Sequence, residues 1–218
     1  MPDLLSVSDL LADALRVLDA GGVVAYPTET VWGLAARPHF AAELYARKGR
    51  EDTKPLQVSC PDTASALALA QPSRALETLS RIWPGPLTVI APARPEHLPG
   101  WGAGAPAVAP GGWVGLRVPA QATALALLRR AGPLATTSLN PSGQPAATTQ
   151  AQAAAYGLAD LLLPGEDALE GQPGHGQPST VVRLPDGERP AEVLRQGAVG
   201  VEDLRAWLAP LGLAVVVR

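Results

Sequence analysis

The chain has few of the residues that build disulfide frameworks, zinc sites or aromatic-rich surfaces. Its 218 residues include one cysteine, Cys60, and only 4% aromatic side chains. A lone cysteine excludes a disulfide framework and a cysteine-rich zinc site, and we expect it to be a small buried side chain at the end of a strand. The histidines at 39, 97 and 175 show no metal-ligand spacing. We therefore assign no metal ligand.

Long apolar runs are also missing. No stretch approaches the roughly 20 apolar residues that cross a bilayer, and no basic region precedes an apolar run at the N-terminus. We expect a cytoplasmic protein without a secretory signal or membrane contact. The net charge of −3 argues against a protein that mainly grips nucleic acid, because such binding grows with the phosphates neutralised. It leaves room for a local basic pocket.

Short apolar runs alternate with helical patterns along the chain. Strands are predicted where such runs lie between turn residues: 23–26, 56–59, 87–91, 114–118, 134–137, 160–163, 179–184, 191–194 and 213–217. Asp62 and Ser73 are candidate N-caps of two successive helices. Residues 92–112 are expected to form a long surface loop. The pattern favours a single α/β domain over 1–218, with helices covering the sheet.

Several familiar nucleotide and nucleophile motifs are absent, among them the phosphate loop, the G-x-G-x-x-G fingerprint and the G-x-S-x-G elbow. A basic cluster is present instead, formed by Arg47, Lys48, Arg50 and Lys54. It could be a solvated helix end. However, a glycine and a proline break the helix and the charges lead into a buried strand, which favours cations at the mouth of a sheet, where α/β folds bind ligands.

Two polar turns accompany this cluster. Thr28, Glu29 and Thr30 follow one apolar strand, and Ser138-Leu-Asn-Pro-Ser-Gly-Gln144 follows another. Each could simply satisfy backbone groups in a turn. Together with the cations, they are the parts needed to hold a polyanion beside a small polar substrate.

Seven motifs occur in an order that resembles one known family. They are Tyr26-Pro-Thr-Glu-Thr-Val-Trp-Gly-Leu34, Lys48-Gly-Arg50 with Lys54-Pro-Leu56, Trp83-Pro-Gly-Pro-Leu-Thr88, Gly115-Leu-Arg-Val-Pro119, Ser138-Leu-Asn-Pro-Ser-Gly143, Ser179-Thr-Val-Val182 and Leu194-Arg-Gln-Gly197. From about residue 8 to 200 the chain resembles the YrdC-type threonylcarbamoyl-AMP synthases, in their short, single-domain form.

The resemblance implies a YrdC-like twisted mixed sheet flanked by helices, with a central basic cavity. It also implies a reaction: L-threonine, bicarbonate and ATP give threonylcarbamoyl-AMP and pyrophosphate, with Mg2+ shielding the triphosphate. Partner proteins would then transfer the threonylcarbamoyl group to adenosine 37 of tRNA, and this chain would make at most a weak contact with the tRNA. Positioning and charge neutralisation would drive such a transfer.

The resemblance also implies roles for named residues. Lys48 and Arg50 are the candidate catalytic residues. The candidate ATP-binding residues are Lys48, Arg50, Lys54, Asn140, Thr148 and Arg195. The candidate threonine-binding residues are Thr30, Ser59, Arg117, Ser138 and Ser179, with Arg117 holding the carboxylate through its planar fork.

Three positions depart from the family pattern. Ser59 stands where the family often has histidine, the segment between Gly33 and Lys48 is a few residues short, and Trp113 replaces a small hydroxyl residue. Two other functions stay open on this fold. One is a noncatalytic RNA- or ribosome-binding protein, which the acidic charge and few aromatics disfavour. The other is a carbamoyl-transfer module of the hydrogenase-maturation type, which the lack of zinc-finger cysteines disfavours.

Overall fold

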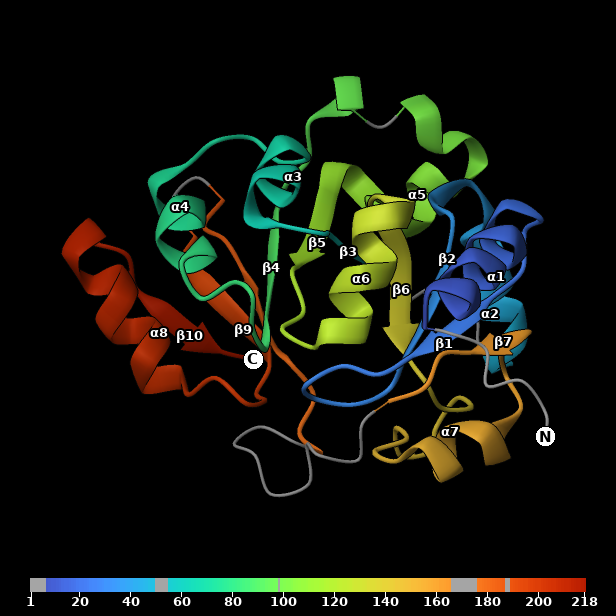
Figure 1. The fold of residues 1–218 in the computed structure, drawn as a ribbon. Coiled ribbons are helices and arrows are strands. Elements are labelled where there is room, and N and C mark those ends of the chain that lie inside the picture. Colours follow the sequence, from blue (N-terminus) through green and yellow to red (C-terminus); the bar gives the residue numbers. More distant parts are fainter. Residues whose placement is uncertain (1–6, 50–54, 98, 166–175, 187–188) are drawn as a thin grey trace, which may run out of the picture.

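A computed structural model describes residues 7–49, 55–97, 99–165, 176–186 and 189–218. Within them the chain forms one twisted mixed sheet in the order β10-β9-β8-β4-β5-β3-β6-β2-β1-β7 (Figure 1). The strands are β1 (Val24–Tyr26), β2 (Gly33–Ala36), β3 (Gln57–Ser59), β4 (Leu87–Pro92), β5 (Trp113–Arg117), β6 (Leu134–Ser138), β7 (Leu161–Leu162), β8 (Thr180–Arg183), β9 (Ala191–Arg195) and β10 (Val215–Val217). The predicted α/β sheet is confirmed.

Helices cover the sheet in two groups. The helices are α1 (Val7–Asp19), α2 (Ala42–Lys48), α3 (Thr63–Ala68), α4 (Arg74–Ser80), α5 (Ala105–Val108), α6 (Ala122–Ala131), α7 (Gln150–Tyr156) and α8 (Val201–Leu208). Helices α1 and α6 pack together over β1, β2 and β6, where Leu18 and Leu127 are fully buried. Helices α3, α4 and α8 pack over the half of the sheet that contains β4, β8 and β9. Burial of these apolar faces is the main stabilising contribution.

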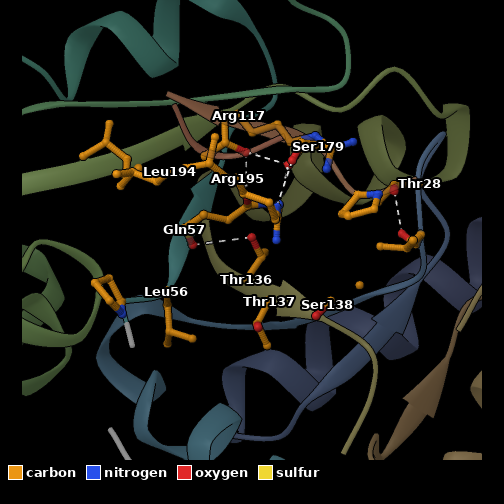
Figure 2. Close-up of a pocket in the computed structure, with 18 of the residues that line it drawn as sticks. Thr28, Leu56, Gln57, Arg117, Thr136, Thr137, Ser138, Ser179, Leu194 and Arg195 are labelled. Atoms are coloured by element: carbon orange, nitrogen blue, oxygen red, sulfur yellow. Dashed lines mark hydrogen bonds between the residues drawn. The ribbon is translucent and has the colours of Figure 1, made fainter. Parts of the chain in front are cut away.

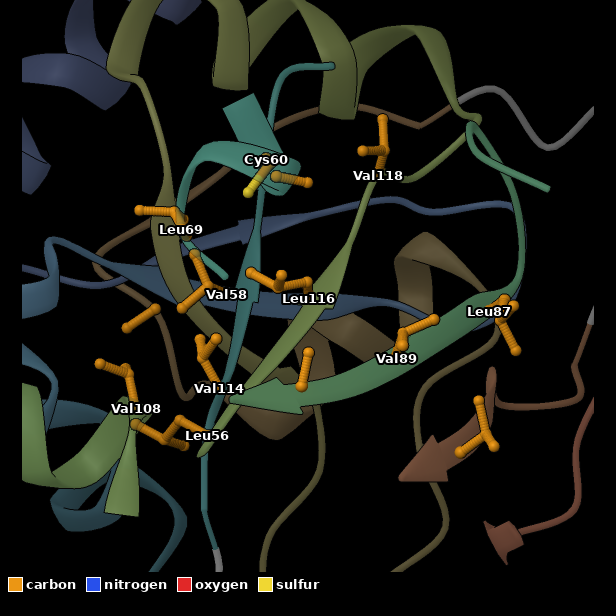
Figure 3. Packing of buried hydrophobic residues seen from close by; sticks show 14 of the residues in the cluster. Leu56, Val58, Cys60, Leu69, Leu87, Val89, Val108, Val114, Leu116 and Val118 are labelled. Atoms are coloured by element: carbon orange, nitrogen blue, oxygen red, sulfur yellow. The ribbon is translucent and has the colours of Figure 1, made fainter. Parts of the chain in front are cut away.

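Strict alternation along the central strands separates the core from a polar face. In β5, Val114 and Leu116 are fully buried in the apolar core, as are Leu87 and Val89 of β4 (Figure 3). The residues between them, such as Gly115, point to the opposite side of the sheet, because successive side chains of a strand alternate. The strand register thus sets which residues share the polar face.

The predicted helix caps are confirmed. The Asp62 carboxylate accepts a hydrogen bond from the Ser65 amide at 2.7 Å, and the Ser73 hydroxyl accepts one from the Leu76 amide at 3.1 Å. Cys60 is fully buried as expected, and this burial raises the pKa of its thiol.

Two expectations need correction. Strand β2 was not expected, yet it lies inside the sheet between β1 and β6. The predicted surface loop 92–112 is more ordered than anticipated, since it contains α5 and short 3-10 turns. Val108 within it is fully buried, so this segment is part of the core. Among the described residues, no helix is both long and apolar enough to cross a membrane.

Candidate active site

A cavity of about 480 Å³ opens on the polar face of the central strands. Four of the predicted site residues line it: Arg117, Ser138, Ser179 and Arg195. They come from β5, from the end of β6, from the start of β8 and from β9, so segments far apart in the chain meet there (Figure 2). Two arginines and two hydroxyl residues that are far apart in the sequence therefore share one cavity.

Arg117 forms the most buried charged contact in this cavity. Its Nη2 donates to Glu29 Oε1 at 2.8 Å and to Thr30 Oγ1 at 2.9 Å, and its side chain is only 5% exposed. Its Nε is buried and has no hydrogen-bond partner among the described residues. A buried donor without an acceptor costs free energy, so this N–H is suited to an acceptor that a ligand brings.

The hydroxyl next to Arg117 has a defined hydrogen-bond direction. Thr28 Oγ1 lies 2.6 Å from the Val31 carbonyl, to which it must donate, and 2.9 Å from Thr30 Oγ1. Because Thr28 has only one hydroxyl proton, Thr30 donates to Thr28 and accepts from Arg117. Thr30 is fully buried and does not line the cavity, so its hydroxyl holds the Arg117 guanidinium in place from behind.

A second series of side-chain hydrogen bonds begins at Arg195 and continues through Ser179 and Thr88 to Gln57. The Arg195 Nε donates to the Ser179 carbonyl and its Nη2 to Ser179 Oγ, both at 3.0 Å. Thr88 Oγ1 lies 2.9 Å from Ser179 Oγ and donates to Gln57 Oε1 at 3.0 Å. Ser179 therefore donates to Thr88 and accepts from Arg195, just as Thr30 accepts from Arg117.

The charges of Arg117 and Arg195 interact across the cavity. Although much of the Arg195 residue is open to solvent, its guanidinium is turned into the cavity wall. Desolvation there, together with the charge of Arg117, lowers the pKa of Arg195. Two like charges held close together favour binding of an anion between them.

Ser59 lies behind the cavity lining. It is 1% exposed, and its hydroxyl is 2.9 Å from Thr136 Oγ1 and 3.3 Å from the Tyr26 hydroxyl. Thr136 and Tyr26 themselves line the cavity. Burial raises the pKa of Tyr26, against the opposing hydrogen bond from Ser59. Ser59 thus orients two lining residues and is not itself in the lining.

Lys48 is the last residue of α2, and its buried side chain reaches the turn that follows β6. Its Nζ donates to the Ser138 carbonyl at 2.5 Å, to the Asn140 carbonyl at 2.7 Å and to Asn140 Oδ1 at 3.0 Å. Asn140 Oδ1 also accepts from the Ser138 hydroxyl at 2.6 Å, and its Nδ2 donates to the carbonyls of Pro141 and Gln144. Lys48 and Asn140 therefore shape the backbone that presents Ser138.

The predicted site residues within the described part of the chain that do not line the cavity are Thr30, Lys48, Ser59, Asn140 and Thr148. Thr148 donates to Gln152 Oε1 at 3.0 Å and is not a lining residue. Arg50, Lys54 and His175 lie outside the described residues. Pro55, which follows Lys54 in the chain, does line the cavity.

Sequence reasoning missed several lining residues, among them Gln57, Thr88, Thr136, Arg183 and Leu194. Thr88 lies in a quoted motif, and Thr136 lies two residues before Ser138 on the same strand, so period-two alternation could have found both. Arg183 had no such signal, because its place depends on which strand pairs with β4. Among the described residues, no three His, Cys, Asp or Glu side chains gather as metal ligands.

Comparison with known proteins matches this geometry to one family. The Sua5/YciO/YrdC family model, described as "Telomere recombination", matches residues 16–197. A Bacillus subtilis (strain 168) threonylcarbamoyl-AMP synthase is 36% identical over 218 residues, which cover 96% of this chain but only 60% of that protein. The threonylcarbamoyl-AMP synthase of Stutzerimonas stutzeri (strain A1501) is 37% identical, with 81% of this chain and 94% of that protein covered.

A solved structure leads to the same family. The crystal structure of P. abyssi Sua5 complexed with L-threonine superposes with a TM-score of 0.79 and 28% sequence identity, covering 97% of this chain and 60% of that one. The chain thus spans about three fifths of the longer relatives and nearly all of the shorter one. Since the family model covers most of the sequence, this chain belongs to the Sua5/YciO/YrdC family.

Proposed function

We propose that this chain is a threonylcarbamoyl-AMP synthase, which forms threonylcarbamoyl-AMP and pyrophosphate from L-threonine, bicarbonate and ATP. The observation that carries the proposal is the unpartnered, buried Nε of Arg117 in a cavity that also holds Arg195. Such a site calls for a carboxylate beside a second anion. The relatives named threonylcarbamoyl-AMP synthase support it.

The threonine subsite is proposed at Arg117. Its Nε and the rest of its fork would hold the carboxylate, and the free lone pair of Ser179 would accept a hydrogen bond from the ammonium or hydroxyl group. Thr30, which is fully buried, would act on threonine through Arg117. Ser138 would close the subsite from the opposite wall, and Ser59 would act through Tyr26 and Thr136. The P. abyssi Sua5 structure with L-threonine supports a threonine site on this fold.

The nucleotide is proposed to lie on the Arg195 side. Arg195 would neutralise phosphate charge, and we propose that Arg50 and Lys54 add to it. Lys48 and Asn140 would act by holding the turn that carries Ser138, and Thr148 stays a proposed contact at the edge. Mg2+ would arrive with the triphosphate as Mg·ATP, drawing its ligands from phosphate oxygens and water.

The reaction needs positioned charge more than a protein nucleophile. The threonine ammonium first gives up a proton to water, and the neutral nitrogen then forms a bond to the carbon of bicarbonate with loss of water, which gives a carbamate. A carbamate oxygen then bonds to the α-phosphorus as its bond to the pyrophosphate oxygen breaks. The arginines hold both anions close despite their mutual repulsion and stabilise the charge on the departing pyrophosphate.

The wider setting is part of the same proposal. Residues 1–218 would act as a single domain in the cytoplasm, where ATP and tRNA occur. The product would pass to threonylcarbamoyl-transfer proteins that modify adenosine 37 of tRNA, with at most a weak contact between this chain and the tRNA.

The test is a pyrophosphate-release assay on the purified chain with Mg·ATP. Release is expected to require both threonine and bicarbonate, and to fall when serine or alanine replaces threonine. Release without threonine, or none at all, would contradict the proposal. A salt-sensitive gel shift of tRNA in the absence of any release would favour the RNA-binding alternative instead.

A further inference from the structure

Gln57 is a lining residue to which the proposed reaction gives no role. It lies on β3, where it pairs with Gly115 of β5 and Thr136 of β6, and its half-buried side chain lines the cavity. Its amide oxygen accepts a hydrogen bond from Thr88 Oγ1 at 3.0 Å, and its amide nitrogen donates to Ser59 Oγ at 3.4 Å. The two ends of one amide group therefore contact two different hydroxyl groups.

The surroundings of Ser59 fix the orientation of this amide. Thr136 Oγ1 donates its proton to the backbone carbonyl of Gln57 at 3.4 Å. Ser59 Oγ, which lies 2.9 Å from Thr136 Oγ1, therefore donates to Thr136. With that proton used, Ser59 has only lone pairs left, one for the Tyr26 hydroxyl at 3.3 Å and one for Gln57. The amide nitrogen of Gln57 must face Ser59, so its oxygen faces Thr88.

The amide oxygen in turn decides where the next hydroxyl protons point. Thr88 has one hydroxyl proton and gives it to Gln57 Oε1. Ser179 Oγ lies 2.9 Å from Thr88 Oγ1, so Ser179 gives its proton to Thr88. Arg195 Nη2 donates to the same Ser179 oxygen at 3.0 Å. Ser179, which lines the cavity, thus keeps one lone pair and no proton for a ligand.

A reversed amide would produce the opposite state. If the nitrogen of Gln57 faced Thr88, it would donate to Thr88 Oγ1, and Thr88 would donate to Ser179. The Ser179 proton would then point into the cavity. The same serine would offer a donor where it now offers an acceptor, so its hydrogen-bonding character depends on Gln57.

We propose that Gln57 is a positioning residue that keeps Ser179 an acceptor for the side-chain hydroxyl of the substrate amino acid, an inference that rests on the proposed function. The charge of Arg195 lies against the same oxygen and disfavours a substrate ammonium there. A neutral hydroxyl that brings its own proton fits the position. The site then selects an amino acid with a free hydroxyl and rejects the corresponding ether, which has no proton to donate.

The experiment compares L-threonine with O-methyl-L-threonine, which keeps the side-chain oxygen but lacks its proton. Calorimetry without ATP would measure both Kd values for the wild type and for Gln57→Leu. The added methyl group is the same in every measurement, so the ratio of the ether Kd to the threonine Kd is compared between proteins. In Gln57→Leu, Thr88 can donate to Ser179 and Ser179 to the ether oxygen. The ratio should therefore fall about fivefold from the wild-type value, which corresponds to one net hydrogen bond.

Two further variants test the direction of the hydrogen bonds, and they also serve if Gln57→Leu fails to fold. Gln57→Glu keeps an oxygen that faces Thr88, so its ratio should stay within about twofold of the wild-type value. Thr88→Val removes the acceptor of the Ser179 proton, so its ratio should fall as in Gln57→Leu. Melting curves would identify any loss of folding.

Gln71→Leu provides the matched control. Gln71 is an exposed glutamine that does not line this cavity, so the same change of residue type there should leave both Kd values and their ratio unchanged.

A wild-type ratio in both Gln57→Leu and Thr88→Val would overturn the inference, even if both ligands bind more weakly, because a merely structural side chain would affect the two ligands alike. Failure of the proposed function looks different, since the wild type itself would then neither bind threonine nor release pyrophosphate in response to it, and the inference would fall with it. Normal threonine-dependent release by the wild type, together with an unchanged ratio in the variants, would remove the role of Gln57 alone.

Discussion

The ammonium group of Lys48 donates two hydrogen bonds to Asn140, one to its backbone carbonyl at 2.7 Å and one to its side-chain Oδ1 at 3.0 Å. With the bond to the Ser138 carbonyl, three protein acceptors face the three protons of this cation. The contact joins the end of α2 to a turn 92 residues further along the chain. Lys48 therefore organises the cavity wall that carries Ser138.

From this arrangement we expect Lys48→Met to lose stability and activity together. The change removes one donor from each of three buried or half-buried acceptors, which should cost about 2–4 kcal/mol of unfolding free energy. Urea unfolding and pyrophosphate release would be measured on the same samples. Arg195→Met is the matched comparison, because it should lower ATP use with little change in stability. A fully stable but inactive Lys48→Met would instead place the ammonium on the phosphates.

The pair of Glu29 and Arg117 leads to a second prediction. Glu29 Oε1 accepts from Arg117, and its Oε2 accepts from the Ala120 amide at 3.0 Å, with side chains 15% and 5% exposed. In Glu29→Gln the buried guanidinium loses its counter-charge, so the free protein should be less stable by about 2–4 kcal/mol.

Threonine should restore much of that loss. Its carboxylate supplies the missing negative charge, so the rise in melting temperature on adding threonine should be larger in Glu29→Gln than in the wild type. Thermal unfolding with and without threonine, and with threonine methyl ester as the neutral control, measures this. An equal rise in both proteins would mean that the carboxylate binds away from Arg117.

A substitution can distinguish the role of the planar hydrogen-bond donors of Arg117 from the role of its positive charge. Arg117→Lys keeps a cation but loses the planar donors, including the Nε for which the described part of the chain offers no acceptor. We expect the KM for threonine to rise about tenfold or more while the KM for ATP changes little. Steady-state kinetics with each substrate varied would test this, and a matching rise in both KM values would contradict a threonine-specific role.

Particular residues show how far the sequence could lead. The caps at Asp62 and Ser73 followed from local chemistry, since each cap bonds an amide only three residues away. Strand β2 was missed because Gly33–Ala36 has no β-branched residue, and its strand form depends on pairing with β1 and β6.

The site shows the same limit. Arg117, Ser179 and Arg195, which the family resemblance singled out, all line the cavity. It could not show whether the Lys48 charge faces a ligand or a turn, because that depends on a contact distant in sequence. Trp113 stood out as a departure, but Arg183, whose guanidinium carbon lies 4.2 Å from the centroid of the Trp113 ring, could not be paired with it before the register of β4 with β5 and β8 was known.

The last prediction concerns pH and the contact between Asp160 and Arg47. Asp160 accepts from Arg47 Nη2 and from the Val23 amide, each at 2.8 Å. Burial acts to raise the pKa of Asp160, but these bonds and the charge of Arg47 outweigh it, so the pKa is lowered. A lowered pKa in the folded state adds stability above the unfolded pKa of about 3.9, and this contribution is lost as the pH falls through the folded value.

Asp160→Asn should therefore be less stable than the wild type at pH 7, and the difference should shrink as the pH falls below about 4 toward the lowered pKa of the folded state. We expect a difference of about 1 kcal/mol or less, because the Asp160 side chain is 38% exposed and solvent screens the pair. Urea midpoints at pH 7, 5 and 3 would measure it. Arg47→Gln removes the same ion pair from the other side and should give the same pH profile. If the deficit of Asp160→Asn is equally large at all three pH values, lost packing or the lost Val23 hydrogen bond causes it, and the carboxylate charge does not.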